Sequence, residues 1–412
     1  MHIARFIVAI FALSLGGRVA NAQPPAEHWV GSWATAVQAP EQGNALAPAD
    51  LTDATLRQVV HLSLGGGALR VRLSNAFGTA PLHIAAAHIA RPTANGGIDP
   101  ATDKALTFSG APDVTIPAGA DYVSDPVAFD AGPSSDVAIS LYFDKPPVSQ
   151  TGHPGSRATS FVAHGNLVGA AQLPNAKTVE HWYEIEGLDV QAAAGAESVI
   201  AFGDSITDGH GSTTNGNDRW PDVVARTLRE NESTSDIAVL NAGIGGNHLL
   251  TDGLGPNALA RFDRDVLTPP GVKAVILLEG INDLGGLTFS GEVPLAAHEA
   301  LVQRIIAADE QIVTRAHAHG ILVYGAPITP DMGSDYYHPD AQNEADRQAV
   351  NAWIRVRGNF DGVIDFDAVV RDPAHPDHLL PAYDSGDHLH PGPAGYRVMG
   401  EAAARAIIDM NR

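Results

Sequence analysis

Five short apolar segments alternate with helix-like stretches through the second half of the chain. The segments, between residues 198 and 367, are SVIAFG, IAVLNAG, AVILLEG, ILVYGAP and GVIDFD. The helix-like stretches cover residues 220–230, 259–267, 294–318, 343–356 and 394–410. Near-continuous apolar strands separated by helices are typical of a parallel sheet that is covered on both faces. The sequence therefore predicts a three-layer α/β/α domain over residues 196–412.

The first half of the chain has a different pattern of apolar and polar residues. The segments LRVRLSN and VAISLYF alternate apolar and polar residues, which is typical of half-buried strands. Three glycines, Gly65 to Gly67, separate two such segments and favour a hairpin. We expect an all-β sandwich, resembling a jelly roll, over residues 23–165. Residues 166–195 are expected to connect the domains, with HWYEIEGLDV as a further possible strand.

The N-terminal residues have the order of a secretory signal peptide. Arg5 precedes an apolar run from Phe6 to Leu15, and the small residues Ala20-Asn21-Ala22 follow. An uncleaved anchor is disfavoured, because about ten apolar residues are too few to span ~30 Å of hydrocarbon. We expect cleavage after Ala22 and export to the periplasm or the medium, without membrane insertion.

Charge and cysteine content exclude several kinds of site. The chain has 47 acidic and 25 basic residues, for a formal net charge of −22, and it has no cysteine. Such an acidic chain disfavours nucleic acid or an anionic membrane as a partner. Without cysteine there is no disulfide, no cysteine nucleophile and no cysteine-based zinc site.

The first strand of the α/β half ends in Gly203-Asp204-Ser205. Ligands of open α/β sheets bind at the carboxyl ends of the strands, so Ser205 is a candidate nucleophile. The alternative is that Ser205 or Asp204 caps a helix N-terminus, as serine and aspartate commonly do, and for this motif alone it stays open. The Gly-x-Ser-x-Gly elbow of α/β-hydrolases is absent from the sequence, which disfavours that fold.

Two more strand ends carry hydrogen-bond donors. Gly243 follows one strand, where its N–H is a candidate donor to a developing oxyanion. Asn282 follows another, and its amide can donate to an oxyanion without a change of charge. A plain turn and an Asx-turn are the structural alternatives. A dinucleotide loop is disfavoured at Gly243, because His248 stands where the third glycine is required.

The segment DSGDHLHPGPAGY places Asp387 three residues before His390. This spacing lets a short turn bring the carboxylate to one imidazole nitrogen, the geometry of a base and its orienting partner. A metal-dependent hydrolase is an alternative, because carboxylates and imidazoles also suit zinc. Its ligands would come from His375, Asp377, His378, Asp387, His388 and His390. That alternative gives no role to Ser205, Gly243 or Asn282.

Together these four motifs resemble those of the SGNH (GDSL) hydrolase superfamily over about residues 196–412. The name-giving residues match Ser205, Gly243, Asn282 and His390, with Asp387 at the Asp-x-x-His position. The resemblance implies a flavodoxin-like five-stranded parallel sheet between helices and an ester hydrolase that needs no cofactor and no metal. In it Ser205, Asp387 and His390 form a catalytic triad, and Ser205, Gly243 and Asn282 form the oxyanion hole. The segments WVGSWATAV, LRQVVH and LSNAFG are similar to a two-domain branch with acetyl-xylan-esterase-like members.

The expected function is that of an exported serine ester hydrolase that works through an acyl-enzyme. The preferred substrate is an acetylated carbohydrate, either a small molecule or a polysaccharide. A lipase or arylesterase uses the same residues, and a glycan-binding protein is a further alternative. Four residues near the motifs are candidates for lining the substrate cleft, with packing or capping as the alternative for each: Trp220, Asn247, His248 and Tyr383. The oligomeric state stays open.

Overall fold

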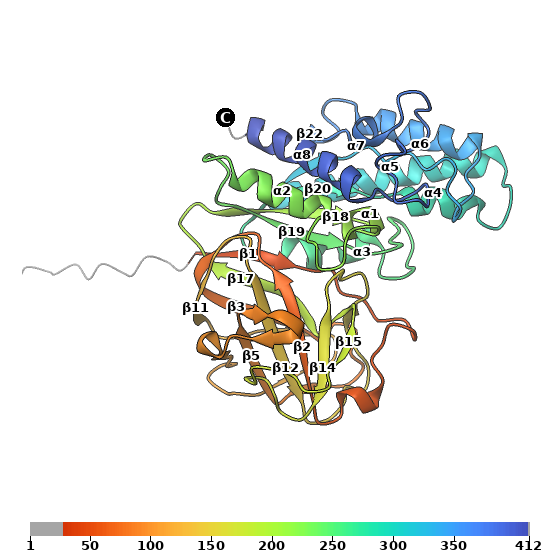
Figure 1. Ribbon diagram of the computed structural model, residues 1–412. Helices are drawn as coiled ribbons and strands as arrows, with labels where there is room; N and C mark the ends of the chain where they lie inside the picture. Colours follow the sequence, from red (N-terminus) through yellow and green to blue (C-terminus); the bar gives the residue numbers. More distant parts are fainter. Residues whose placement is uncertain (1–27, 411–412) are drawn as a thin grey trace, which may run out of the picture.

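The computed structural model describes residues 28–410, which form a β-rich domain and an α/β domain that lie against each other (Figure 1). The signal peptide predicted for residues 1–22 lies outside the described residues. Within them, no helix combines the length and the apolar character needed to cross a membrane.

The β-rich domain consists of two antiparallel sheets and three short strand pairs. The first sheet has the order β1 (Trp29–Ala34), β17 (Ile185–Gln191), β3 (Gly66–Ser74) and β10 (Asp121–Val123), and β11 (Val127–Ala131) also pairs with β3. The second has the order β15 (Lys177–Val179), β14 (Ser160–His164), β2 (Ala54–His61), β12 (Asp136–Phe143), β5 (Ala86–Ala90) and β8 (Lys104–Ala105). The short pairs are β4 (Leu82–Ile84) with β9 (Val114–Ile116), β6 (Pro92–Thr93) with β7 (Gly97–Ile98), and β13 (Gly152–His153) with β16 (Trp182–Tyr183). Apolar residues of both sheets, such as Leu56 and Val71, share one buried core, as a sandwich requires.

Two details of the sequence prediction are wrong in this domain. No hairpin forms at Gly65 to Gly67, because β2 and β3 belong to different sheets and the chain crosses between them there. A Cβ atom on Gly65 would lie 2.5 Å from the carbonyl oxygen of Ala131, so the glycine permits a close backbone approach. Residues 166–195 are not a linker, because they contain β15, β16 and β17, and β17 lies between β1 and β3. These pairings join residues more than 100 positions apart, which local patterns do not reveal.

The α/β domain contains the predicted parallel sheet of five strands. Its order is β19 (Ile237–Gly243), β18 (Glu197–Gly203), β20 (Val272–Leu278), β21 (Leu322–Gly325) and β22 (Gly362–Val363). The helices are α1 (Ser205–Asp208), α2 (Trp220–Arg229), α3 (Ala258–Phe262), α4 (Ile281–Thr288), α5 (Leu295–Ala318), α6 (Ala341–Ile354), α7 (Phe366–Val370) and α8 (Pro393–Met410). All strand pairs in this sheet are parallel, which confirms the predicted fold class.

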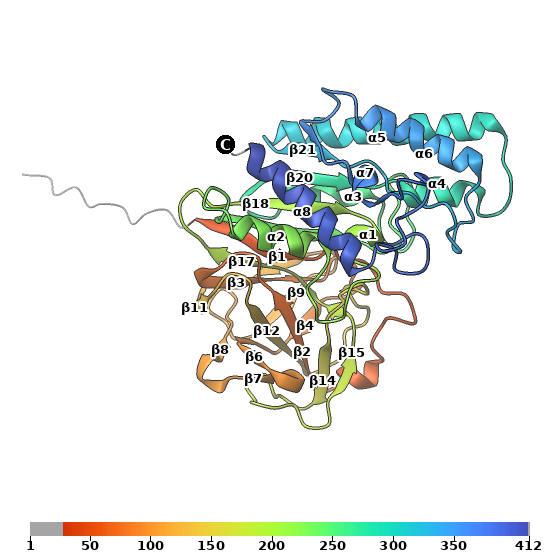
Figure 2. The ribbon, with the colours of Figure 1, turned by 45° about the horizontal axis from the view of Figure 1, so that its top comes forward.

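Alternating residues of each strand explain the three layers. Along β18, Ile200 and Phe202 enter a core with α3 to α6, whereas Val199 and Ala201 enter a second core with α2, α7 and α8. Successive side chains of a strand point to opposite faces, so a strand that is apolar throughout needs helices on both sides. Figure 2 shows α8 and α2 on one side of the sheet and α5 and α6 on the other.

The two domains meet along the edge of the parallel sheet. Strand β1 lies beside β19, and Ala238 of β19 belongs to the core of the β-rich domain. The Gly31 N–H donates to the carbonyl oxygen of Pro270 at 2.9 Å, and the Val239 N–H donates to Ser63 Oγ at 3.0 Å. Hydrogen bonds and apolar packing therefore both fix the β-rich domain against the sheet.

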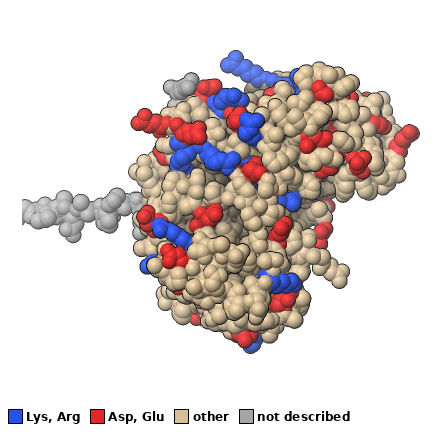
Figure 3. All heavy atoms as spheres, viewed as in Figure 1, with Lys and Arg blue, Asp and Glu red and all other residues tan. Residues whose placement is uncertain are grey.

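Charged side chains of both signs lie on the face of the molecule drawn in Figure 3. On the face drawn in Figure 3, Lys and Arg are interspersed with Asp and Glu, although the whole chain carries a net charge of −22. This face has no broad basic surface of the kind that binds nucleic acid.

Candidate active site

Ser205, His390 and Asp387 form a continuous chain of hydrogen bonds. Ser205 Oγ lies 2.8 Å from His390 Nε2, and His390 Nδ1 lies 2.6 Å from Asp387 Oδ2. Ser205 is the first residue of α1, directly after β18, and the other two residues lie in the turn before α8. The sheet thus brings together residues that are 185 positions apart in the chain.

Asp204, rather than Ser205, caps helix α1. Its Oδ1 accepts a hydrogen bond from the Ile206 N–H at 2.9 Å. The Ser205 hydroxyl is therefore free to bond to His390. Burial raises the pKa of Asp204 to about 7, and the carboxylates of Asp283 and Asp208 act in the same direction.

The turn around Asp387 orients the imidazole of His390. Asp387 Oδ1 accepts hydrogen bonds from the N–H groups of His390 at 2.8 Å and Leu389 at 3.0 Å. Burial alone would raise the pKa of Asp387, but these hydrogen bonds and the one from the His390 ring hold it well below the ordinary value of a carboxyl group. An ionised Asp387 accepts a hydrogen bond from Nδ1–H of His390, which leaves the lone pair of Nε2 facing the Ser205 hydroxyl.

Asn282 presents one amide hydrogen to the site. Its Nδ2 donates to the carbonyl oxygen of Asn247 at 2.6 Å, and its Oδ1 accepts from the Tyr337 hydroxyl at 2.7 Å. These two partners fix which end of the amide is nitrogen. The second hydrogen on Nδ2 stays available, since Asn282 lines the same cavity as Ser205 and His390.

That cavity has a volume of about 700 Å³. Besides Asn282 and the three hydrogen-bonded residues it is lined by His210, Gly245, Gly246, His248, Gly253, Leu254, Asp335, Tyr336, Tyr337 and Leu389. Its size and mixed lining are those of a site for a small molecule or for one end of a larger one.

The Gly243 N–H does not have the role that the sequence predicted, although the residue lies at the end of its strand as expected. It is the last residue of β19, and its N–H donates to Asn241 Oδ1 at 2.9 Å instead of facing the cavity. A Cβ atom at this position would lie 2.2 Å from the backbone nitrogen of Asp208, so the glycine permits α1 to pack on β19. The turn into the cavity comes later, at Gly245 and Gly246, with φ +66° at Gly246.

Three of the four predicted cleft residues do not line the cavity. Trp220 is completely buried and packs on Phe366 with ring centroids 5.1 Å apart. Asn247 is also completely buried, where its side chain bonds to the Pro256 carbonyl oxygen and its main chain holds Asn282. Tyr383 packs against the core under α8. Apolar packing and amide hydrogen bonding explain these residues, and only His248 lies at the cavity.

A buried arginine beneath the site was missed by the sequence analysis. Arg261 donates to the carbonyl oxygens of Gly203 and Ala242, to Asn247 Oδ1, to Asp265 Oδ2 at 2.8 Å and to Glu279 Oε1 at 3.3 Å. It thus ties together the carboxyl ends of β18, β19 and β20. Nothing in the pattern around residue 261 distinguishes this arginine from one on a helix surface.

Tyr337 was also not assigned a role from the sequence. Tyr337 follows no motif, although its hydroxyl fixes the Asn282 amide. His210 lies five residues after Ser205 and also lines the cavity.

The residues of the metal-binding alternative do not converge. His375, His378 and His388 line a separate cavity. Among the described residues, the one set of three ligand-type side chains close enough to share an ion is His210, Asp387 and His390. Both ring nitrogens of His390 already bond to Ser205 and Asp387, so this set fits proton transfer better than ion binding.

A parallel sheet that presents a hydrogen-bonded serine, histidine and aspartate at its carboxyl edge defines a hydrolase domain. Residues 201–398 match the model of the GDSL-like Lipase/Acylhydrolase family. The second half of the chain is therefore a domain of this family, and the protein is an ester hydrolase. This confirms the family resemblance seen in the sequence, apart from the acetyl-xylan-esterase-like branch.

Solved structures similar to this chain match about half of it. One described as a lipolytic protein of the G-D-S-L family, from Desulfitobacterium hafniense, is 27% identical over 50% of this chain and 98% of its own, with a TM-score of 0.37. A GDSL-like lipase from Bacteroides thetaiotaomicron is 20% identical over 54% of this chain and 92% of its own, with a TM-score of 0.38. The aryl esterase of M. smegmatis is 16% identical over 52% of this chain and 99% of its own, with a TM-score of 0.36. No curated protein matches this sequence.

Proposed function

We propose that the protein hydrolyses carboxylic esters with Ser205 as nucleophile, His390 as general base and Asp387 as the carboxylate that orients it. The observation that carries this proposal is the pair of short contacts, 2.8 Å from Ser205 Oγ to His390 Nε2 and 2.6 Å from His390 Nδ1 to Asp387, at the wall of the cavity. A hydroxyl becomes a competent nucleophile when an adjacent base can take its proton.

The reaction then has two halves. As Ser205 Oγ attacks the ester carbonyl carbon, its proton passes to His390 Nε2, and the same proton leaves on the alcohol oxygen as the acyl-enzyme forms. A water molecule then gives its proton to His390 and attacks the acyl carbon, and the proton returns to Ser205 as the acid departs. Asp387 stays ionised throughout and stabilises the imidazolium.

The oxyanion is proposed to receive hydrogen bonds from Asn282 Nδ2 and from the N–H groups of Ser205 and Gly246. Gly246 replaces Gly243 in this role, because Gly246 lines the cavity and the Gly243 N–H is bonded to Asn241. Donors aimed at the position of the developing charge stabilise the tetrahedral intermediate more than the ground state.

The proposed substrate class is an acetylated carbohydrate. Tyr336 and Phe289 are 62% and 61% exposed, and their ring centroids lie 5.8 Å apart at the rim of the cavity. Exposed apolar rings beside a cavity mark a binding surface, and flat rings suit the apolar faces of sugars. A small aryl ester is the second candidate, since Leu254, Leu389 and Tyr337 give the cavity an apolar wall.

A panel of esters tests both the mechanism and the substrate. Purified protein is assayed with p-nitrophenyl acetate, p-nitrophenyl palmitate, phenyl acetate and acetylated xylan. Release of acetate from xylan with the highest kcat/KM supports the carbohydrate substrate, and a preference for phenyl acetate supports the aryl ester. Ser205→Ala is expected to abolish turnover and Asn282→Ala to reduce kcat by ~10²–10³. The matched control is Ser233→Ala, an exposed loop serine.

Two results would overturn the catalytic assignment. One is full activity of Ser205→Ala while Ser233→Ala behaves in the same way. The other is activity that a chelator abolishes and a serine-directed phosphonate leaves unchanged. Either would mean that the hydrogen-bonded chain does not carry the reaction.

We also propose export, with cleavage after Ala22. The support is the order of Arg5, the apolar run and the small residues in the sequence. Mass spectrometry of the protein made in a secreting host is expected to show Gln23 as the first residue. An intact N-terminus on protein outside the cytoplasm would contradict it.

A further inference from the structure

One segment of the β-rich domain lies directly against the loop that carries the serine. Residues 151–160 face α1 and the chain after it. His153 Nε2 lies 2.9 Å from Asp208 Oδ1, and both side chains are 3% exposed. A Cβ atom on Gly155 would lie 1.8 Å from Asp208 Oδ2, so only a glycine fits there without a shift. This tight contact fixes the position of the segment relative to α1.

Arg157 extends this contact to the wall of the cavity. Its backbone has φ +48°, and its carbonyl oxygen accepts from the Asn215 N–H at 2.8 Å, which fixes the corner where the side chain begins. Its guanidinium NH2 donates to Nδ1 of His210 at 3.2 Å. The β-rich domain therefore supplies a cation to a histidine of the cavity.

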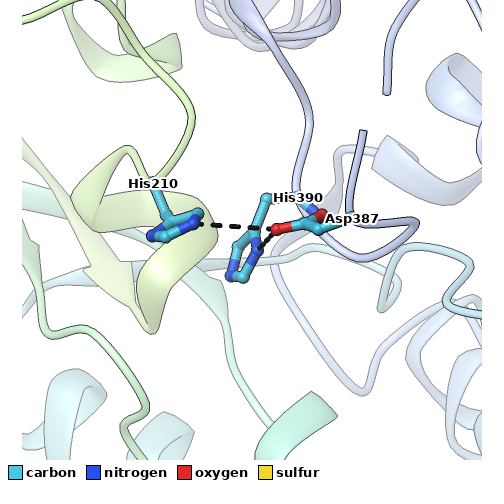
Figure 4. Close-up of side chains that lie close together, drawn as sticks. All are labelled: His210, Asp387 and His390. Atoms are coloured by element: carbon cyan, nitrogen blue, oxygen red, sulfur yellow. Dashed lines mark hydrogen bonds and ion pairs between the residues drawn. The ribbon is translucent and has the colours of Figure 1, made fainter. Parts of the chain in front are cut away.

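This contact determines the protonation of His210. A guanidinium has donors only, so Nδ1 of His210 must accept, and the ring then carries its single proton on Nε2. That Nε2 lies 3.7 Å from Asp387 Oδ2, and the ring centroid lies 4.1 Å from that of His390 (Figure 4). A neutral His210 can stand beside the imidazolium that forms on His390 during turnover, whereas a charged one would repel it.

The charged groups around His210 come from three elements. Arg157 faces it from the β-rich domain, Asp208 from α1, and Asp387 and His390 from the turn before α8. Burial and the charges of His390 and Arg157 together lower the pKa of His210 to about 4, against the opposing effect of the two carboxylates. Without Arg157 the pKa of His210 rises, because the carboxylates of Asp387 and Asp208 still favour the protonated ring.

We propose that Arg157 and His210 are positioning residues through which the β-rich domain holds the Asp387–His390 pair in its working charge state. Arg157 keeps His210 neutral, and neutral His210 leaves the Asp387 carboxylate to His390. If Arg157 is lost, His210 takes up a proton in mildly acidic solution, competes for Asp387 and repels protonated His390. This role rests on the proposed function of His390 as general base.

The pH dependence of kcat separates this role from a general structural one. Arg157→Ala is expected to lose at least about twofold in kcat at pH 5 relative to the wild type, since a rise of one unit from a pKa of about 4 leaves about half of His210 protonated at that pH. Near pH 9, where His210 is neutral in both proteins, the variant is expected to approach wild-type turnover. KM is expected to change little. Arg157→Lys, which keeps the cation, is expected to recover part of the activity at pH 5.

Two variants serve as controls. Thr159→Ala removes the bond from Asn215 Nδ2 to Thr159 Oγ1 in the same segment without touching His210, and it is expected to leave the pH profile unchanged. His210→Asn cannot titrate, so adding Arg157→Ala to it is expected to cause no further loss at low pH. An equal loss for Arg157→Ala at pH 5 and pH 9, or an additive loss in the His210→Asn background, would overturn the proposal.

A direct titration keeps the inference testable if no ester is hydrolysed. In protein carrying Ser205→Ala, the pKa of His210 is measured by NMR of the histidine side chains, with and without Arg157→Ala. We expect Arg157→Ala to raise it by at least one unit. An unchanged pKa would refute the role of Arg157 whatever the enzyme acts on, and a raised pKa without esterase activity would refute only the proposed function.

Discussion

Replacing Arg261 by methionine tests how the site is supported from below. The side chains of Arg261 and Glu279 are both completely buried, and Asp265 is 4% exposed. Methionine fills most of the space but removes the donor to Glu279 and to three uncharged acceptors, whereas Asp265 keeps its bond from Arg264. Breaking a buried ion pair by removing one partner costs ~3–5 kcal/mol, mainly because the remaining charge is uncompensated.

The expected loss is large enough to measure by thermal unfolding. A change of 1 kcal/mol shifts Tm by ~2–4 °C in a domain of 150–250 residues, so Arg261→Met is expected to lower Tm by roughly 6–20 °C. The control is Arg397→Met. Arg397 and Glu401 are 61% and 38% exposed, and exposed pairs contribute ~0–1 kcal/mol.

The pH dependence identifies the cause of the loss. Burial raises the pKa of Glu279 well above its ordinary value, and the charge of Arg261 opposes this effect. In Arg261→Met that opposition is gone, so the folded state binds a proton on Glu279 more tightly than the unfolded state does. The variant is therefore expected to be least destabilised at pH 5 and most at pH 8. The double variant Arg261→Met/Glu279→Gln, which removes the buried charge, is expected to regain part of the loss at pH 8.

Differential scanning calorimetry at pH 5 and pH 8 measures all four proteins. A loss below about 1 kcal/mol for Arg261→Met, the size of one ordinary hydrogen bond, would refute the argument from buried charge. A double variant that is less stable at pH 8 than Arg261→Met alone would also refute this argument.

Three further outcomes are expected. Tyr337→Phe removes the bond that fixes the Asn282 amide, so kcat is expected to fall ~2–10-fold at nearly constant KM in steady-state assays; a change in KM alone would contradict this. Asp387→Asn is expected to lower kcat by ~10²–10⁴ at every pH between 5 and 8, with no shift in the pH profile of kcat. The reason is that the pKa of Asp387 is held so low that the carboxyl group stays ionised over this range. Glu184 is buried and accepts only weak bonds from the Thr151 N–H, and burial raises its pKa well above the ordinary value. The free energy of unfolding of the wild type is then highest below the pKa that Glu184 has in the unfolded state, and it falls as the pH rises toward the pKa of the folded state. Glu184→Gln is expected to reduce this fall between pH 5 and pH 8, as measured by urea unfolding. An unchanged fall would refute the argument.

The sequence predicted the α/β domain well because its strands are short, apolar and bounded by turns. The strand that ends at Gly203 and the one that ends at Gly243 were both placed correctly. Once the strands of a parallel sheet are known, their carboxyl ends must lie on one edge, so Ser205, Asn282 and His390 could be predicted to converge. The three side chains do line one cavity.

The β-rich domain was harder to predict. Alternation identified its strands but not their partners, which lie far apart in the chain, as β17 does from β1 and β3. A tryptophan, an asparagine and a tyrosine near the motifs were assigned to the cleft by position. Burial of Trp220 and Asn247 could not be deduced from that position, because neighbours in sequence point to different sides of a loop.

The sequence by itself determined the kind of sheet and the residue types at its edge, because apolar periodicity and turn chemistry are local properties. Only the three-dimensional structure decided which arginine binds beneath the strands, because Arg261 bonds to a carbonyl oxygen 58 positions away. It also decided which glycine N–H faces the cavity and which residue caps α1, because these depend on the exact backbone path of each turn and not on residue type. The contact of Arg157 with His210 is of the same kind: two ordinary loop residues of different domains are related only by the packing that brings them to 3.2 Å.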